Sequence, residues 1–82
     1  MFYLTESIIL KSVMPDDPEM RKREGEYVRG LIAEGKILSA YRQVGGKGSY
    51  MTWDVESNEE LQKYLADFPM ATIRLPVSVS RL

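Results

Sequence analysis

The chain has 82 residues, of which 44% are apolar, and it contains no cysteine and no histidine. Eleven basic and twelve acidic residues give a net charge of −1, so neither nucleic acid nor an anionic membrane is expected as a partner. The lack of cysteine excludes disulfides and thiol catalysis, and the lack of histidine removes the usual base at neutral pH and the commonest metal ligand. Any proton transfer must therefore use carboxylate, tyrosine, lysine, serine or threonine side chains.

The length predicts one domain, 1–82, with a marginal core, because a domain of this size buries only about 60–65% of the surface of its unfolded chain. Association with further copies would add to that core. The sequence begins with strand-like residues instead of a signal peptide, and no apolar run approaches about 18 residues. We therefore expect a cytoplasmic protein.

The first half of the chain predicts a strand followed by a helix. Residues 2–10 are rich in aromatic and β-branched side chains, which is typical of a strand, and 11–15 form the loop that leaves it. Asp16 or Asp17 is a suitable cap for a helix that continues to Glu34, and Gly35 ends it.

The middle of the chain predicts a β-hairpin. Residues 36–44 and 49–55 both have strand character, and the glycine-rich stretch 45–48 joins them.

The last third predicts a second helix and a fourth strand. Ser57 is a cap for this helix, Glu60 stands at capping-box spacing from it, and Pro69 ends the helix. Residues 71–80 form the last strand, in which Pro76 requires a sheet edge or a bulge.

The order βαββαβ predicts an α+β, ferredoxin-like fold, with an antiparallel four-stranded sheet and two helices on one face. The other face of the sheet needs a cover. In so small a chain the simplest cover is a second copy, so we expect a homodimer that packs sheet against sheet as a dimeric α/β barrel.

Glu24 is the side chain that most requires a chemical explanation. At about 100° per residue it lies within the apolar stripe of the first helix, together with Met20, Tyr27, Val28 and Leu31. A buried carboxylate must be paired, hydrogen-bonded or protonated, and burial raises its pKa. Glu24 is therefore a candidate acid and base. The alternative is a side chain that reaches water at the flank of the helix, or a structural ion pair.

Strand 36–44 supplies further candidates. Alternation places Arg42 on the same face as Leu38, Ala40 and Val44, where its guanidinium would bind a carboxylate in a bidentate manner. That carboxylate would belong to a ligand or to Glu24, and an internal ion pair without substrate is equally consistent with the sequence.

Three other side chains are weaker candidates for substrate binding. Ser39 and Tyr41 lie on the opposite face of the strand from Arg42, and Trp53 belongs to the next strand. Both aromatic residues also suit a core or an interface.

Several of these residues form a pattern that resembles the muconolactone isomerase family. The matching stretch runs from Glu34-Gly35 through Tyr41-Arg42, Gly45 and Trp53-Asp54-Val55 to Ser57, Glu60-Leu61 and Pro69. The match is ungapped and extends over nearly the whole chain. It places Glu24 on the glutamate of the family's first helix that is proposed to move protons.

The resemblance implies isomerisation of an unsaturated lactone by proton transfer without a cofactor or a metal. It also implies a dimer that is built into larger rings such as a decamer, and a place in aromatic compound catabolism or a related biosynthetic pathway. The chain departs from the family at 37–40, 47–49 and 70–73, and it lacks the family's histidine-containing tail. We therefore expect an altered pocket and a different substrate.

The mechanism expected from these residues is a proton shuttle. Glu24 removes a proton α or γ to a carbonyl and returns it elsewhere on the conjugated system, while Arg42 anchors a substrate carboxylate or stabilises the enolate. Two other functions remain open. One is a cofactor-free oxygenase or cyclase of dimeric α/β-barrel type, and the other is a non-catalytic ligand-binding or assembly module.

Overall fold

The computed structural model describes residues 1–9, 18–44, 48–71 and 74–82. The element order confirms the βαββαβ prediction. The elements are β1 (Phe2–Ile9), α1 (Pro18–Ala33), β2 (Ile37–Arg42), β3 (Gly48–Asp54), α2 (Asn58–Ala66) and β4 (Arg74–Arg81). The predicted first-helix cap at Asp16 or Asp17, loop 11–15 and most of the hairpin loop lie outside the described residues.

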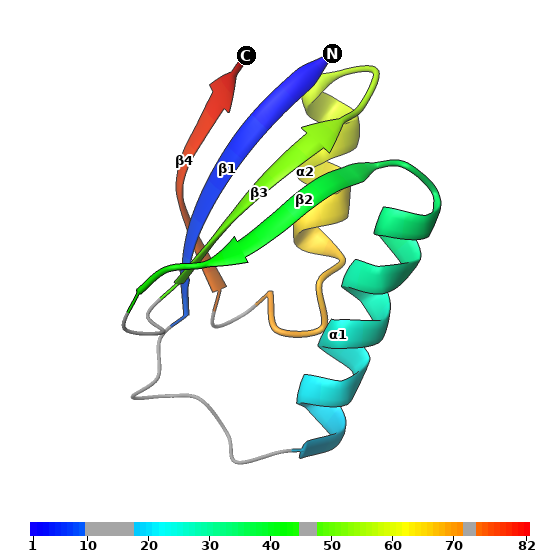
Figure 1. Ribbon diagram of the computed structural model, residues 1–82, viewed down its shortest axis with the longest axis vertical. Helices are drawn as coiled ribbons and strands as arrows, with labels where there is room; N and C mark the ends of the chain where they lie inside the picture. Colours follow the sequence, from blue (N-terminus) through cyan, green and yellow to red (C-terminus); the bar gives the residue numbers. More distant parts are fainter. Residues whose placement is uncertain (10–17, 45–47, 72–73) are drawn as a thin grey trace.

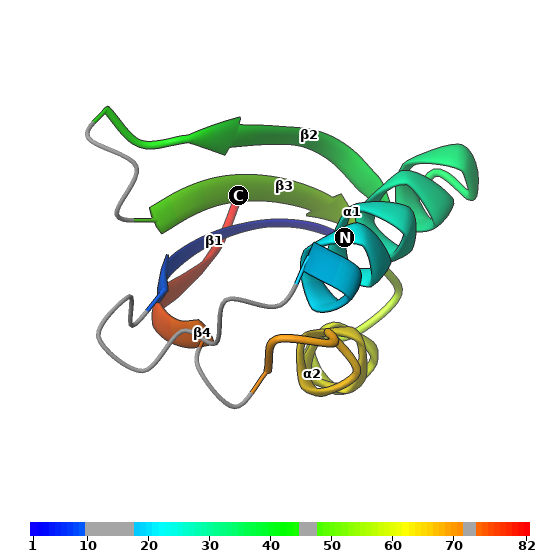
Figure 2. The same cartoon turned by 90° about the horizontal axis from the view of Figure 1, so that it is seen from below.

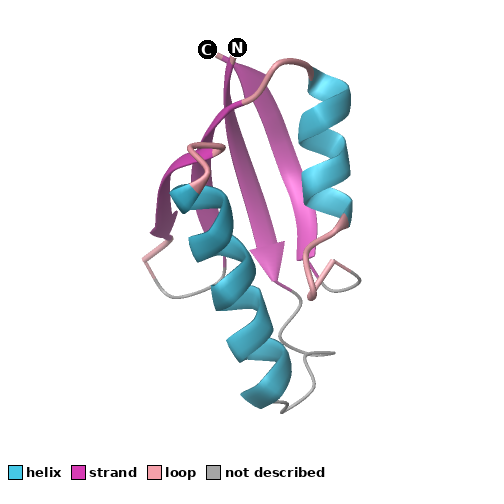
Figure 3. Ribbon diagram, turned by 90° about the vertical axis from the view of Figure 1, so that its right-hand side faces the viewer, coloured by secondary structure: helices cyan, strands magenta, loops and turns pink. Residues whose placement is uncertain are grey.

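The strands form one antiparallel sheet in the order β2-β3-β1-β4 (Figure 1). Both helices lie on the same side of this sheet, so one face is covered and the other is open (Figures 2 and 3). The ferredoxin-like α+β fold is thus confirmed. No helix in the described part of the chain is long and apolar enough to span a bilayer.

The core lies between the helices and the covered face of the sheet. Trp53 is completely buried, and the ring of Phe68 meets it edge-on at 6.3 Å. The indole Nε1–H donates to Thr5 Oγ1 at 3.0 Å, which satisfies two polar groups inside the core. The other buried apolar side chains are Tyr3, Leu31, Ile37, Met51, Val55, Leu61, Leu65 and Met70.

Two helix ends predicted from single residues are confirmed, whereas α2 ends at Ala66 with Asp67 as its cap, before the predicted end at Pro69. Gly35 has a φ of 78°, and the amides of Gly35 and Lys36 donate to the carbonyls of Ile32 and Leu31, which is a Schellman ending of α1. At the start of α2, Ser57 Oγ accepts the amide of Glu60 at 3.1 Å.

The edge strands explain the positions of two irregularities. β4 is an edge strand, and its register with β1 shifts between Glu6 and Ser7, next to the residue that pairs with Pro76. The predicted edge or bulge at Pro76 is therefore confirmed.

β2 is the other edge strand, and here the simple alternation predicted from the sequence is wrong. Ile37 pairs with Trp53 but Ser39 pairs with Thr52, so Leu38 is an extra residue in the strand. Past this bulge, Ala40 and Arg42 lie on the covered face together with Ile37. Leu38 no longer belongs to their alternating row.

Candidate functional site

Glu24 lies on the inner side of α1, and its side chain is 7% exposed. This confirms the inward position predicted from helical spacing. Its Oε2 accepts the backbone amide of Met70 at 3.0 Å, and Oε1 is also shielded from solvent. Burial disfavours the charged carboxylate whereas the amide hydrogen bond favours it, so this contact bears directly on when Glu24 holds a proton.

Tyr27 lies one turn further along the same side of α1. Its hydroxyl donates to the carbonyl of Tyr64 at 2.7 Å, and its ring packs on Phe68 with centroids 4.8 Å apart. Burial, with a contribution from the negative charge of Asp67, raises the pKa of Tyr27 to about 12. The phenol is therefore a stable hydrogen-bond donor at neutral pH.

Arg42 ends β2 on the covered face of the sheet. It pairs with Ser49, which in turn pairs with Ser7, so these three residues form one row across β2, β3 and β1. Residues directly opposite each other on one face have Cβ atoms about 4.5–5.5 Å apart. The row therefore has a guanidinium on the edge strand, the hydroxyl-bearing Ser49 next to it and Ser7 one strand further in. A guanidinium in this position suits an anionic or carbonyl oxygen.

Glu24 and Arg42 do not neutralise each other within one copy. Arg42 is exposed, and no ion pair joins it to Glu24 among the residues that the structure describes. The first half of α1, the segment after α2 and the end of β2 all lie toward the same end of the sheet (Figure 1). The structure thus leaves the Arg42 guanidinium accessible to a ligand at that end.

Ser39 and Tyr41 lie on the open face of the sheet, as expected from their alternation with Arg42. The hydroxyls of Ser39 and Thr52 hydrogen-bond to each other, and Tyr41 pairs with Tyr50 with 66% of its surface exposed. Within one copy they are separated by the sheet from Glu24.

Trp53 is on the covered face but is fully buried in the core and bound to Thr5. A side chain that packs in this way supports the site without offering surface to a substrate. The structure therefore brings Glu24 and Arg42 to the covered face, and it separates them from Ser39 and Tyr41.

Two contacts that shape this site could not be predicted from the sequence. Tyr27 was visible as a member of the apolar stripe, but its bond to the Tyr64 carbonyl had no signal in the sequence. The Met70 amide likewise has none, because any residue except proline supplies a backbone N–H.

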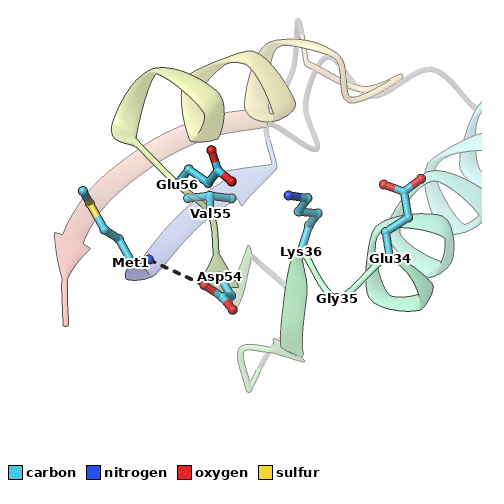
Figure 4. A pocket seen from close by; sticks show the side chains of 7 residues that line it. All are labelled: Met1, Glu34, Gly35, Lys36, Asp54, Val55 and Glu56. Carbon is cyan, nitrogen blue, oxygen red and sulfur yellow. Dashed lines mark ion pairs between the residues drawn. The ribbon is translucent and has the colours of Figure 1, made fainter.

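A shallow hollow of about 280 Å³ lies at the other end of the molecule (Figure 4). Its lining residues are Met1, Glu34, Gly35, Lys36, Asp54, Val55 and Glu56. The Met1 amino group lies 3.6 Å from Asp54, and Lys36 Nζ lies 3.0 Å from Glu60 Oε1. The Glu60 hydrogen bond raises the pKa of Lys36, and the same contact lowers the pKa of Glu60. Its two cationic groups are therefore already paired, and none of the predicted site residues lines it.

Comparison with known proteins identifies the family of this chain. The model of the muconolactone delta-isomerase family matches residues 1–81. The chain belongs to this family.

Two relatives agree with that assignment. The "Muconolactone Delta-isomerase 1" of Acinetobacter lwoffii is 32% identical over 72 residues, which cover 85% of this chain and 75% of the relative. The "Muconolactone Delta-isomerase" of Cupriavidus pinatubonensis is 36% identical over 52 residues, which cover 63% of this chain and 56% of the relative. The chain thus spans only part of the length of each relative.

A solved structure agrees with the fold. It is the 5-chloro-2-hydroxyhydroquinone dehydrochlorinase (TftG) from Burkholderia phenoliruptrix AC1100, in complex with 2,5-dihydroxybenzoquinone. The likeness has a TM-score of 0.71 and covers 100% of this chain and 93% of that one, at 18% sequence identity. Membership of the muconolactone delta-isomerase family supports an enzyme that isomerises a small molecule or performs a related reaction.

The described residues contain no group of three or more carboxylate side chains close enough together to hold a metal ion. Among the described residues, the covered face carries the buried carboxyl of Glu24 and the exposed guanidinium of Arg42.

Proposed function

We propose that this protein is a cofactor-independent isomerase that moves a proton on a small unsaturated lactone or a related conjugated carbonyl compound. The observation that carries the proposal is Glu24, a buried carboxyl with a defined hydrogen bond, in a chain of the muconolactone delta-isomerase family. A general base placed in this way contributes about 10²–10⁴-fold to the rate of a proton transfer.

The proposed reaction has two proton transfers. Glu24 takes the proton from a carbon α or γ to the carbonyl, the C–H bonding electrons move into the conjugated system, and negative charge develops on the carbonyl oxygen. The protonated Glu24 then donates a proton to a different carbon, and the carbonyl is restored; in D₂O, exchange of the carboxyl proton with solvent before this second step places deuterium at that carbon. The product is an isomer of the substrate, so no oxidant or reductant is consumed.

Arg42 is proposed to hold the negative oxygen atoms of the substrate. Its guanidinium lies on the same face of the sheet as Ser7 and Ser49, and an Arg in this setting would bind a carboxylate or a developing enolate. Ser39 and Tyr41 lie on the open face, so the sheet separates them from a substrate that is bound on the covered face of the same copy.

The test compares the wild-type protein with Glu24→Gln on a panel of unsaturated lactones that includes muconolactone, in D₂O. Isomerisation and deuterium uptake at carbon are both followed by NMR. We expect Glu24→Gln to lower both rates by about 10²–10⁴-fold. Glu26→Gln is the matched control, because Glu26 is an exposed carboxylate on the same helix.

Equal rates in wild type and Glu24→Gln would show that Glu24 is not the base. A wild-type protein that neither isomerises nor exchanges any lactone of the panel would contradict the isomerase. An oxygen electrode in the same assay separates isomerisation from the oxygenase alternative, which consumes O₂.

We also propose that a second copy of the chain covers the open face of the sheet. The exposed apolar side chains on this face include Phe2, Ile8, Tyr41 and Tyr50. Its central carboxylate, Glu6, already accepts hydrogen bonds from Gln43 and Tyr50 within its own copy. This face therefore offers apolar surface with polar groups that are already satisfied, which is the combination that a stable dimer requires.

A further inference from the structure

Two side chains of α1 bind the backbone of the same short segment. Glu24 accepts the Met70 amide at 3.0 Å, and Tyr27 donates to the Tyr64 carbonyl at 2.7 Å. Residues three apart lie on the same side of a helix, so Glu24 and Tyr27 act on this segment together.

The segment 64–70 is the end of α2 and the turn that follows it. Asp67 caps the helix, and its amide donates to the carbonyls of Lys63 and Tyr64, each at 3.2 Å. The Tyr64 carbonyl thus receives both a backbone donor and the phenol of Tyr27. Phe68 packs on the Tyr27 ring, so one residue of α1 holds this turn through a hydrogen bond and a ring contact.

Met70 is the last residue of this segment and lies within the turn that the Ala71 amide closes on the Phe68 carbonyl. The position of the Met70 amide therefore depends on how the turn is held. The terminal torsion of a glutamate is broad, and the side chain alone does not select one orientation of its carboxylate. A backbone amide that approaches one carboxylate oxygen from a fixed direction selects one orientation of the carboxylate. The direction in which the other oxygen of Glu24 points depends on the same contact.

We propose that Tyr27 is a positioning residue for Glu24: by fixing the turn after α2, it holds the Met70 amide against Oε2 and so orients the carboxylate. The inference rests on the proposed function in one respect, namely that Glu24 transfers the proton. Tyr27 itself touches neither the substrate nor the reacting atoms in this scheme.

These hydrogen bonds predict the direction in which the pKa of Glu24 changes when the Tyr27 hydroxyl is removed. Without the Tyr27 hydroxyl the turn is held less firmly, and the Met70 amide spends less time on Glu24. A hydrogen bond from an amide favours the charged carboxylate, so its weakening raises the pKa of Glu24. The other titratable groups whose charges act on Tyr27 are Asp67, Tyr64 and Glu34, and all of them are retained when Tyr27 becomes phenylalanine.

The test uses Tyr27→Phe, which removes one oxygen atom and keeps the ring on Phe68. Tyr3→Phe is the matched control, because it also removes the hydroxyl of a buried tyrosine, one that donates to Met1 Sδ at 3.4 Å. Amide hydrogen exchange of Met70 and the NMR titration of the Glu24 carboxyl are measured in all three proteins. Glu24→Gln identifies the Glu24 signal.

We expect the Met70 amide to exchange about tenfold faster or more in Tyr27→Phe, as for a local opening that has become easier. The Glu24 titration should move to higher pH in this variant only. With an active lactone, kcat should fall about three- to tenfold with little change in KM, and the acidic limb of the pH profile should move in the same direction.

Wild-type values for both Met70 exchange and Glu24 titration in Tyr27→Phe would overturn the inference. If Tyr27→Phe does not fold, Phe68→Leu weakens the other anchor of the turn and should shift the same two signals. Turnover that survives Glu24→Gln, combined with altered Met70 exchange in Tyr27→Phe, would instead refute the proposed base and retain the positioning contact.

Discussion

The phenol of Tyr27 predicts how the stability of the fold responds to high pH. Burial and the nearby Asp67 raise its pKa from 10.0 to about 12 in the folded state. Because the folded pKa lies above that of the unfolded chain, folding favours the neutral phenol. Its contribution to the free energy of unfolding is fully present below about pH 10 and is lost as the pH rises through about 12.

Urea unfolding at about pH 9 and about pH 12 tests this. The wild type should lose more stability over this interval than Tyr27→Phe, which has no phenol at this position to ionise. Tyr64, whose pKa is also raised by burial, is present in both proteins and contributes equally to both. Parallel losses in the two proteins would show that Tyr27 does not titrate in this range.

For single residues, the sequence predicted whether a side chain faces the interior better than it predicted the hydrogen-bond partner of that side chain. Helical spacing was enough to place Glu24 inside the protein, because the period of a helix is fixed by its geometry. Its bond to Met70 spans 46 residues of sequence and depends on where the turn after α2 lies. Likewise, Trp53 was a weaker candidate for substrate binding that also suited a core or an interface, and its burial and its contact with Thr5 place it in the core.

Single secondary-structure elements depend on local signals, and α2 offers a direct test. Ser57→Ala removes the side-chain oxygen that accepts the Glu60 amide at 3.1 Å. We expect a loss of about 0.5–2 kcal/mol in the free energy of unfolding, measured with urea at neutral pH.

Ser80→Ala is the control for this substitution, because Ser80 is exposed on the edge strand β4. It should change stability by no more than about 0.5 kcal/mol. If the two variants were equally stable, the capping contact at Ser57 would contribute nothing.

The helix ends at Gly35 and Ser57 were predicted correctly because one residue type determines each of them. The end of α2 was misplaced, since α2 stops at Ala66 with Asp67 as its cap, before Pro69. Gly35 adopts a positive φ that other residues rarely tolerate, and the Ser57 hydroxyl satisfies an amide that the helix leaves unpaired. The bulge at Leu38 was missed because it depends on pairing with β3, and nothing within β2 marks the extra residue.

For the whole molecule, the open sheet face predicts self-association. Tyr41 is 66% exposed on this face, so Tyr41→Lys should cost the single copy little while placing a charge in the proposed dimer interface. We expect the dimer dissociation constant to rise about 100-fold or more, as measured by sedimentation over a range of protein concentrations. The same experiment reports whether dimers join into larger rings.

Ile32→Lys is the control, because Ile32 is an exposed apolar residue of α1 on the helix side of the sheet. It should leave the dimer intact. A wild-type protein that remains monomeric, or a Tyr41→Lys protein that associates as the wild type does, would contradict the proposed interface.

The overall fold followed from the sequence because strand and helix patterns alternate in an order that few compact topologies accommodate. The division of the candidate residues between two faces was only partly predictable. Alternation separated Arg42 from Ser39 and Tyr41, but the bulge decides which of these faces the helices cover.

The extra residue in β2 therefore assigns side chains to two different environments. In a regular strand that kept Leu38, Ile37 and Arg42 would lie on opposite faces, because a shift of one position inverts a strand. With Ile37 held in the core, Arg42 would then point into the space between copies, and Tyr41 would turn beneath the helices. Deleting Leu38 itself would instead leave every later residue of β2 with its present partner and face, so loss of one codon would straighten the edge of the sheet and keep the chemistry of both compartments.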